Sequence, residues 1–173
     1  MVTNDKGLVD AIRVLNNHGR RTSTDHAVEG FNARLDGIQG AVLSAKLPRL
    51  EGWNDRRRQA AERYNQLLAD VDVVTPAEMP YAKHIYHVYV IRVKNRDEVK
   101  QGMAEKGVGC GMHYPIPIHL LDAYKRFNRP KGTYPVTEAA AEEILSLPMF
   151  PEITAEQQQY VVDSLADVLG KMA

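Results

Sequence analysis

The sequence contains a single cysteine, Cys110, and no long run of apolar residues. One cysteine cannot form a disulfide within the chain, which fits a reducing compartment. Met1 is followed by polar residues instead of a basic and then an apolar stretch, so a signal peptide is not expected. No segment reaches the length of a membrane-spanning helix. The composition therefore predicts a cytoplasmic protein that does not associate with a membrane.

An excess of charge of either sign is also lacking, because 22 Lys and Arg residues balance 22 Asp and Glu residues. A nucleic-acid partner normally requires a basic surface. Three consecutive arginines at residues 56–58 are a local exception, and they fit a solvated helix face. We therefore expect no nucleic acid among the partners.

Several well-known catalytic motifs are missing as well. The sequence holds no Walker phosphate loop and no GxSxG nucleophile motif. The alternating glycines of Gly107-Val-Gly-Cys-Gly111 do not match GxGxxG and instead predict a close backbone approach at the entry to a strand. Cys110 has no base near it in sequence, so a nucleophilic role is not expected. Hydrophobic residues still make up 44% of 173 residues, which is enough for a domain with a core.

The pattern of apolar residues predicts an α+β fold with a small sheet covered by helices. Residues 85–93 are β-branched and aromatic, which predicts a strand. A second short strand is predicted at 108–113, and residues 1–3 have the character of a strand end. Helices are predicted at 5–17, at 35–68 with a break at Pro48, at 96–106, at 136–146, and from a capping box at Thr154–Gln157 onward.

Four histidines occur as two pairs. His84 and His87 lie in or beside the predicted strand, where a spacing of three puts them on opposite faces. His113 and His119 flank the segment 114–118, which two prolines keep extended, so that both can face a cleft. A zinc site needs three or four converging ligands, and these spacings match no known template, so no metal is expected. His87 alone equally fits a packed histidine with a hydrogen-bonded ring.

Asn32 and Arg34 lie just before the helix predicted from residue 35. Backbone N–H groups at a helix start attract anions, and amide and guanidinium donors suit phosphate oxygens. The pattern alone favours another interpretation, in which Asn32 is the N-cap of that helix.

Taken together, six segments resemble the DegT/DnrJ/EryC1/StrS family of pyridoxal-phosphate-dependent sugar aminotransferases. They follow the family's order and spacing and cover nearly the whole chain. Three departures are visible: Phe31 stands where tyrosine is common, Gly40 where alanine is common, and Leu121-Asp122 where a glutamine-containing pair is frequent. The matching segments are Asn17–Arg20, Gly30–Gln39, the helix from Trp53 to Tyr64, His84–Arg92, His113–His119 and Leu145–Pro151.

The resemblance implies the aspartate-aminotransferase type of fold (fold type I), in which a large domain carries the cofactor and a small C-terminal domain covers it. Residues 1–50 are then the tail of the large cofactor domain with a connecting helix, and residues 51–173 are the C-terminal small domain. The family's Schiff-base lysine lies shortly before the strand end at residues 1–3, and Lys6 and Lys46 do not match its motif. No catalytic residue is therefore expected in this chain.

The resemblance also implies roles for residues that are present. The asparagine that matches Asn32 reaches the cofactor phosphate of the neighbouring subunit, and the arginine that matches Arg34 lies near the same shared site. Such sharing implies a homodimer. His113, Tyr114 and His119 are expected to contact the sugar-nucleotide substrate, with His87 as a further contact.

The implied activity of the complete enzyme is transfer of an amino group, from glutamate as donor, to a keto-sugar nucleotide, with pyridoxal phosphate as cofactor. A second reading is a fragment of a sugar dehydratase of the same fold, in which histidine replaces the lysine. A third is a stand-alone binding domain without catalysis. The residue that separates the first two readings lies outside this chain, and coding sequence upstream of Met1 would exclude the third.

Overall fold

The computed structural model of the chain describes residues 3–171. The chain divides into two compact units, Met1–Arg49 and Leu50–Ala173, and each is described by itself. The strand end predicted at residues 1–3 lies outside the described residues except for Thr3, which is not in a strand. Among the described residues, no helix combines the length and the hydrophobicity that a membrane span requires.

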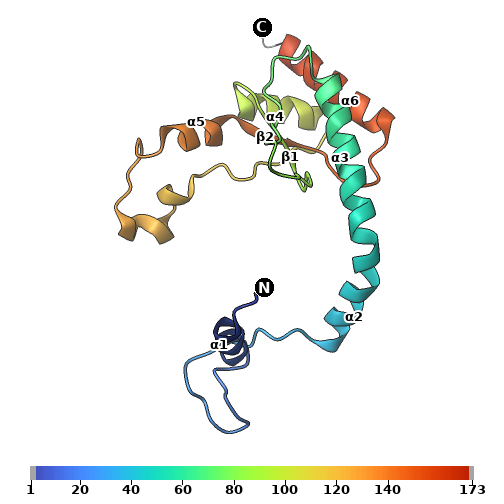
Figure 1. Cartoon of the computed structure of the whole chain (residues 1–173). Helices are drawn as coiled ribbons and strands as arrows, with labels where there is room; N and C mark the ends of the chain where they lie inside the picture. Colours follow the sequence, from blue (N-terminus) through green and yellow to red (C-terminus); the bar gives the residue numbers. More distant parts are fainter. Residues whose placement is uncertain (1–2, 172–173) are drawn as a thin grey trace. The chain divides into compact units, whose positions relative to one another are not determined.

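Figure 1 labels most of the secondary-structure elements, and short 3-10 turns are written η. The first unit contains α1 (Lys6–Asn16), α2 (Gly37–Lys46) and η1 (Leu47–Arg49). The second contains α3 (Leu50–Leu67), β1 (Tyr89–Arg92), α4 (Arg96–Glu105), η2 (Ile118–Leu120), η3 (Asp122–Phe127), α5 (Pro135–Glu143), β2 (Ile144–Leu147) and α6 (Ala155–Gly170).

The first unit has well-formed helices and almost no interior. The carboxylate of Asp5 caps α1 by accepting a hydrogen bond from the N–H of Leu8 at 3.1 Å. Neither α1 nor α2 has a buried residue. Large apolar side chains are instead exposed, and that of Ile38 is 82% accessible. An apolar surface of this kind normally contacts other protein.

The second unit holds the core, which centres on a two-stranded antiparallel sheet. Tyr89 pairs with Leu147 and Ile91 pairs with Leu145, and all four side chains are buried. Along β1, buried residues alternate with more exposed ones, which is the two-residue period of a strand with one buried face. An isolated bridge extends each edge of this sheet, Val74 to Arg92 on β1 and Gly111 to Ser146 on β2.

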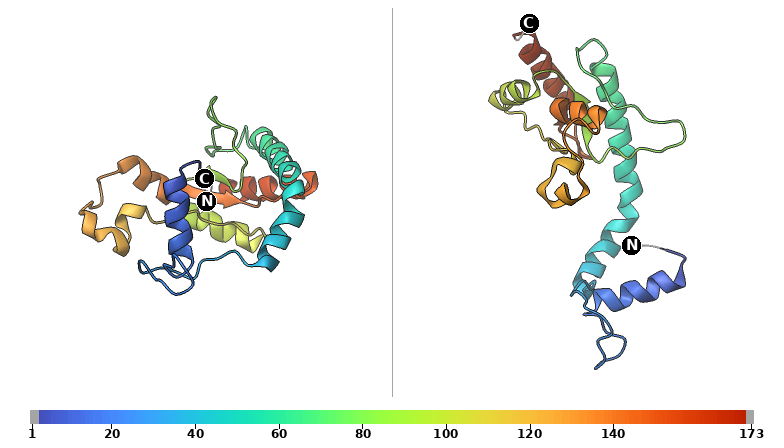
Figure 2. Two further views of the ribbon diagram at one scale, coloured as in Figure 1. Left: turned by 60° about the horizontal axis from the view of Figure 1, so that its bottom comes forward. Right: turned by 90° about the vertical axis from the view of Figure 1, so that its left-hand side faces the viewer.

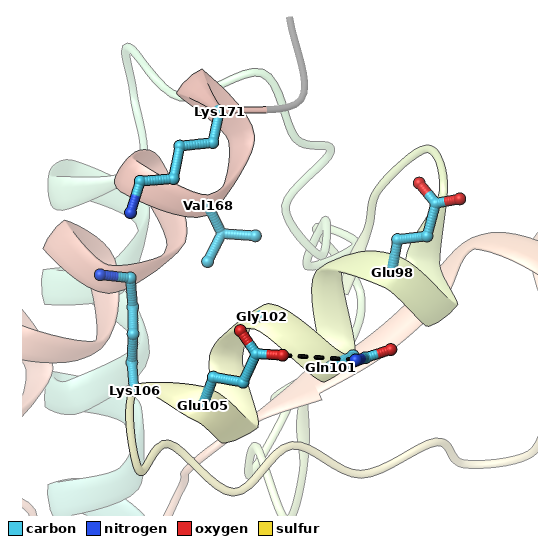
Figure 3. A pocket seen from close by; sticks show the side chains of 7 residues that line it. All are labelled: Glu98, Gln101, Gly102, Glu105, Lys106, Val168 and Lys171. Atoms are coloured by element: carbon cyan, nitrogen blue, oxygen red, sulfur yellow. Dashed lines mark hydrogen bonds between the residues drawn. The ribbon is translucent and has the colours of Figure 1, made fainter.

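Helices α3 and α4 both pack against α6. From α6, the fully buried Gln158 donates to the carbonyl of Ala60 on α3 at 2.8 Å. On the other side, α4 approaches α6 at Gly102, where a Cβ would lie 2.8 Å from a methyl group of Val168 (Figure 3). Glycine therefore sets the spacing of these two helices. In Figure 1, α5 and the yellow-to-orange segment before it extend to the left of the sheet, whereas α3 and α6 lie to its right.

The strand predicted at 85–93 is shorter than expected. Only residues 89–92 form β1, because Tyr86 has a left-handed backbone with φ of 48° that interrupts the pleat. His84 stabilises this turn, since its Nδ1 accepts a hydrogen bond from the N–H of Tyr86 at 2.8 Å. The prediction that His84 and His87 lie on opposite faces of a strand is therefore wrong.

Two further predicted elements differ from those that the chain forms. The segment 108–113 is not a strand, because only Gly111 pairs with β2. The helix predicted at 136–146 ends at Glu143, and its last residues belong to β2. The buried guanidinium of Arg96 is bound at this junction, where it donates to the carbonyls of Ala141 and Ile144. In a short run of apolar residues, the spacing of those residues does not distinguish the end of a helix from a buried strand.

Other sequence signals are confirmed. The break at Pro48 coincides with η1, and α4 is followed by Gly107 with a φ of 74°. Thr154 and Gln157 form the predicted capping box of α6 through two reciprocal hydrogen bonds of 2.9 and 3.2 Å.

Candidate functional site

In the first unit, a loop between α1 and α2 carries Asn32 and Arg34. Asn32 forms an isolated antiparallel bridge with Asn17, the C-cap residue of α1. Backbone hydrogen bonds fix the residues on either side, from Phe31 N–H to the carbonyl of Leu15 at 2.7 Å and from Ala33 N–H to that of Asn16 at 2.9 Å. The backbone of Asn32 is therefore held against the end of α1.

Two glycines, Gly19 and Gly30, allow the backbone segments of this loop to approach each other closely. Gly19 has a φ of 72°, and a Cβ there would lie 1.7 Å from the carbonyl oxygen of Val28. At Gly30 a Cβ would lie 2.0 Å from the backbone nitrogen of Gly19. No other residue fits at either position without moving the backbone. The ring of His26 adds a link, because its Nδ1 lies 2.8 Å from the carbonyl oxygen of His18.

Both candidate side chains of this unit are exposed, and neither forms a hydrogen bond or ion pair with another side chain of residues 3–171. The helix-cap interpretation of Asn32 is wrong, since α2 begins at Gly37 and its N-cap is Asp36. One amide and one guanidinium are therefore available as donors. This donor set fits a phosphate group of a cofactor such as pyridoxal phosphate.

In the second unit, the extended segment His113–Ile118 begins beside β2. The Nδ1 of His113 lies 2.8 Å from the hydroxyl of Ser146, which is buried in β2. This contact orients the exposed imidazole. The ring of Tyr114 lies edge-on to that of His113, with 5.5 Å between centroids, and its side chain is 76% accessible. His113 and Tyr114 thus present an imidazole and a phenol side by side to solvent.

His119 has a different environment at the other end of the segment. Its Nε2 lies 3.0 Å from Oε1 of Glu138 on α5, and the side chains are only 10% and 9% accessible. The ring of Tyr134 packs edge-on against the imidazole at 4.9 Å. The side chain of His119 is therefore fixed within the chain, with one ring nitrogen already engaged.

Glu138 joins three parts of this region. Its carboxylate accepts hydrogen bonds from the N–H of Gly132 at 2.8 and 2.9 Å and from that of Tyr134 at 3.2 Å, in addition to the contact with His119. The N–H of Gly132 is the main cause of a lowered pKa of Glu138, and Tyr134 and His119 act in the same direction. Glu138 is therefore an ionised clamp that holds the segment after His119 onto α5.

His87 does not join the other histidines in a recognisable group. It lies before β1 and is exposed, so the interpretation as a packed histidine is wrong. A separate network lies at His84, in which Arg58 donates to Glu78 at 2.7 Å and to the carbonyl of His84 at 2.6 Å. Among residues 3–171, no three His, Cys, Asp or Glu side chains converge as a metal site would require.

The structure therefore brings together His113 with Tyr114, and separately His119 with Glu138. Glu138, Ser146 and Tyr134 were not recognised as site residues from sequence. A signal for Glu138 exists, because Pro135 begins α5 and an acidic residue in the first turn satisfies free N–H groups. Ser146 has no such signal, since its role depends on a partner 33 residues away.

Comparison with known proteins gives a consistent result. The sequence profile of the DegT/DnrJ/EryC1/StrS aminotransferase family matches residues 1–166. The chain is 42% identical over 170 residues to a pleiotropic regulatory protein of Geobacillus stearothermophilus, covering 96% of this chain and 46% of that protein. It is 34% identical over 168 residues to the dTDP-3-amino-3,4,6-trideoxy-alpha-D-glucose transaminase of Streptomyces venezuelae, covering 96% of this chain and 44% of that enzyme.

Among solved structures, DesV of S. venezuelae in complex with a ketimine intermediate superposes with a TM-score of 0.89 at 35% identity. The alignment covers 96% of this chain and 45% of DesV. The chain thus spans less than half the length of the relatives that it matches. The α+β prediction and its assignment to fold type I are confirmed by this superposition.

Proposed function

The chain belongs to the DegT/DnrJ/EryC1/StrS aminotransferase family, and from this membership we propose that it is the C-terminal part of an enzyme that transfers an amino group to a keto-sugar nucleotide. The superposition on DesV over 96% of this chain is the observation that carries the proposal. The family depends on pyridoxal phosphate, and we propose glutamate as the amino donor. A cytoplasmic location, expected from the composition, is part of the same proposal.

Each of the two units carries residues to which we assign a proposed role. Asn32 and Arg34 would hold the cofactor phosphate, which is supported by their free donors and by the tight loop that fixes the backbone of Asn32. His113 and Tyr114 would contact the substrate, and His119 would shape the wall beside them, since its Nε2 is engaged by Glu138. His87 is kept as a weaker substrate contact, supported by its exposure.

A homodimer is also part of the proposal. In this proposal Asn32 would reach the cofactor phosphate of a neighbouring subunit, as the resemblance to the family implies. Exposed apolar side chains of the first unit support a protein contact there, as Phe31 is 71% and Leu47 is 67% accessible. Both lie in the unit that carries Asn32 and Arg34. Burial of such side chains in an interface is favourable, at roughly 25 cal/mol per Å².

Bound pyridoxal phosphate supplies an electron sink for bond breaking at the carbon that carries the amino group. What this chain's own residues do is bind and orient. No lysine here matches the family's cofactor lysine, and an amine within covalent reach of the cofactor is required for turnover. We therefore propose that residues 1–173 alone do not catalyse the transfer.

The dehydratase of the same fold is the second candidate, and the residue at the lysine position decides between the two. The transaminase named above is a relative at 34% identity, which favours amino transfer. A binding domain without catalysis is the third candidate, and the coverage of 44–46% of each relative argues for a part of a larger enzyme instead.

A first test is titration of the chain with pyridoxal phosphate, followed by borohydride reduction and peptide mapping. We expect absent or scattered labelling of the exposed lysines. Stoichiometric labelling of one lysine would contradict the proposal that the chain lacks the catalytic amine.

A second test uses a chimera in which this chain replaces the matching 45% of DesV. Such a chimera should bind pyridoxal phosphate and transfer an amino group from glutamate to a keto-sugar nucleotide. DesV itself is the positive control. A folded chimera that binds the cofactor and the sugar nucleotide without forming an amino sugar would count against the proposed activity.

A further inference from the structure

The imidazole of His113 lies next to the backbone at the edge of β2. An isolated bridge joins Gly111 to Ser146, with hydrogen bonds of 3.0 Å from the N–H of Gly111 and 2.8 Å from the N–H of Ser146. The chain between α4 and η2 is coloured yellow in Figure 1, and it passes beside the orange β2, as Figure 2 also shows. This pairing holds His113, two residues after the bridge, close to the side chain of Ser146.

Glycine at position 111 leaves room for the ring of His113. A Cβ at Gly111 would lie 2.7 Å from Cε1 and 3.4 Å from Nδ1 of the imidazole. The first distance is too short for a contact between carbon atoms, so any other residue at this position would displace the ring. Glycine in a paired segment often marks a close approach of this kind. Because the ring lies so close to the backbone, its Nδ1 reaches the hydroxyl of Ser146 at 2.8 Å.

The hydroxyl of Ser146 has a single polar partner. Ser146 is 5% accessible, and within residues 3–171 its Oγ forms a hydrogen bond with Nδ1 of His113 and with no other group. A buried O–H group without an acceptor is unfavourable. The hydroxyl therefore donates to Nδ1, and Nδ1 accepts through its lone pair.

The direction of this hydrogen bond determines where the imidazole carries its proton. A neutral imidazole has one N–H group, and when Nδ1 accepts, that group is at Nε2. Nε2 of His113 has no hydrogen bond or ion pair with any residue of the described range 3–171, and the side chain is exposed. His113 thus presents one N–H donor to solvent beside the phenol ring of Tyr114.

From the single partner of its hydroxyl we propose that Ser146 is a positioning residue, which holds His113 as an Nε2–H donor to an oxygen atom of the sugar-nucleotide substrate. Ser146 is buried and acts through His113 alone, and Gly111 contributes by leaving room for the ring. The inference rests on the proposed function and deepens it, because it names the atom of His113 that binds the substrate and the kind of atom that it recognises.

The NMR chemical shifts of the two imidazole nitrogens show which one carries the proton. They can be measured on the chain itself at about pH 8, where an ordinary imidazole is neutral. We expect the proton of His113 on Nε2 alone. Nδ1 of His26 lies 2.8 Å from the carbonyl oxygen of His18, which can only accept, so His26 is the internal reference for a proton on Nδ1. A proton on Nδ1 of His113 would refute the proposal.

Two substitutions disturb the contact in different ways. Ser146→Ala removes the hydroxyl and should give His113 the mixed signals of a free imidazole, whereas Ser146→Thr keeps a hydroxyl and should keep the proton on Nε2. Gly111→Ala leaves the hydroxyl in place but should displace the ring, with the same result as Ser146→Ala. Gly109→Ala is the matched control, because nothing lies within 4 Å of a Cβ at Gly109. Signals of His113 that Ser146→Ala leaves unchanged would contradict the assigned hydrogen bond.

The affinity of the DesV chimera for dTDP-glucose, measured by calorimetry, tests the effect on substrate binding without turnover. Ser146→Ala should weaken binding about two- to tenfold, and Gly109→Ala should leave it unchanged. In a chimera that already carries His113→Ala, adding Ser146→Ala should cause no further loss, because Ser146 acts through His113. Independent losses that add would show that Ser146 acts in another way.

The same measurements separate this inference from the proposed function. If Ser146→Ala and His113→Ala leave the affinity unchanged in a chimera that transfers amino groups, the inference is refuted and the proposed activity stands. If both weaken binding of dTDP-glucose in a chimera that transfers none, the inference is upheld and the proposed activity fails.

Discussion

Nε2 of His119 lies 3.0 Å from Oε1 of Glu138, and both side chains are about nine-tenths buried. This pair connects the proline-containing segment that begins at His113 to α5. The same carboxylate accepts the N–H groups of Gly132 and Tyr134. One acidic residue therefore fixes the end of this segment at His119 and the chain that follows it at Gly132 and Tyr134.

The clamp predicts a specific response to acid. The pKa of Glu138 is lowered in the folded chain, chiefly by the N–H of Gly132. Its contribution to stability is therefore complete above the ordinary glutamate pKa of about 4.3 and is lost as the pH falls through the lowered value. The amide signals of Gly132 and Tyr134 should titrate below that pH in NMR spectra.

Glu138→Gln should abolish this titration and lower the melting temperature at neutral pH. Glu142→Ala is the control on the same helix, because Glu142 has a 73% accessible side chain and only a distant ion pair with Lys131. Titration of Gly132 that persists in Glu138→Gln would show that another carboxyl group is responsible.

Gly102→Ala should destabilise the second unit, because the new Cβ would lie 2.8 Å from a methyl group of the buried Val168. Overpacking of this kind costs about 1–3 kcal/mol, partly offset by the better helix propensity of alanine. Denaturant unfolding followed by the fluorescence of Trp53 measures the change.

Gly52→Ala is the matched control for Gly102→Ala, since nothing lies within 4 Å of a Cβ at Gly52 in α3. It should stabilise by about 0.5–1 kcal/mol. Adding Val168→Ala to Gly102→Ala should relieve part of the cost. Equal effects of the two glycine substitutions would contradict the close contact of α4 with α6.

Gln158→Leu should weaken the contact between α3 and α6. Its Nε2 donates to the carbonyl of Ala60, and its Oε1 accepts from Arg63 at 2.8 Å, so the substitution leaves a half-buried guanidinium without an acceptor. A loss of about 1–3 kcal/mol is expected in the free energy of unfolding. Gln159→Leu, at an exposed position on the same helix, should change it by less than about 0.5 kcal/mol.

Cys110 should react slowly with alkylating reagents. Burial raises the pKa of its thiol to about 11, although Lys100 opposes the shift. About one thiol in a thousand is then ionised at pH 8, and the thiolate is the reactive form. Rates with iodoacetamide should rise about tenfold per pH unit up to pH 10 and approach those of a free thiol in denaturant. A plateau near pH 8.5 in the folded chain would contradict the buried environment.

Asn32→Ala in the DesV chimera should weaken binding of pyridoxal phosphate by about ten- to a hundredfold, the loss expected for a hydrogen bond to a charged group. Arg21→Ala, on the same loop, is the control and should leave cofactor affinity unchanged. Fluorescence of the bound cofactor gives the affinity directly. If the substitution changed only the KM for the sugar nucleotide, the side chain of Asn32 would contact the substrate and not the cofactor.

Local signals in the sequence determined much of the secondary structure. The capping box at Thr154 and Gln157, the glycine after α4 and the apolar period of α3 each depend on residues close together in the chain, and each predicted the element that formed. The family motifs likewise identified the fold, since the proline-containing segments occur at fixed spacing.

Long-range contacts decided what the sequence alone left open or predicted wrongly. The strand at residues 144–147 has the character of a helix end until it pairs with β1, and residues 85–88 have strand composition but turn because His84 and Tyr86 bind each other. The ionised clamp at Glu138 and the orientation of His113 by Ser146 join residues 19 and 33 positions apart. Burial and hydrogen bonding between distant segments are properties of the folded chain, so only the tertiary structure reveals them.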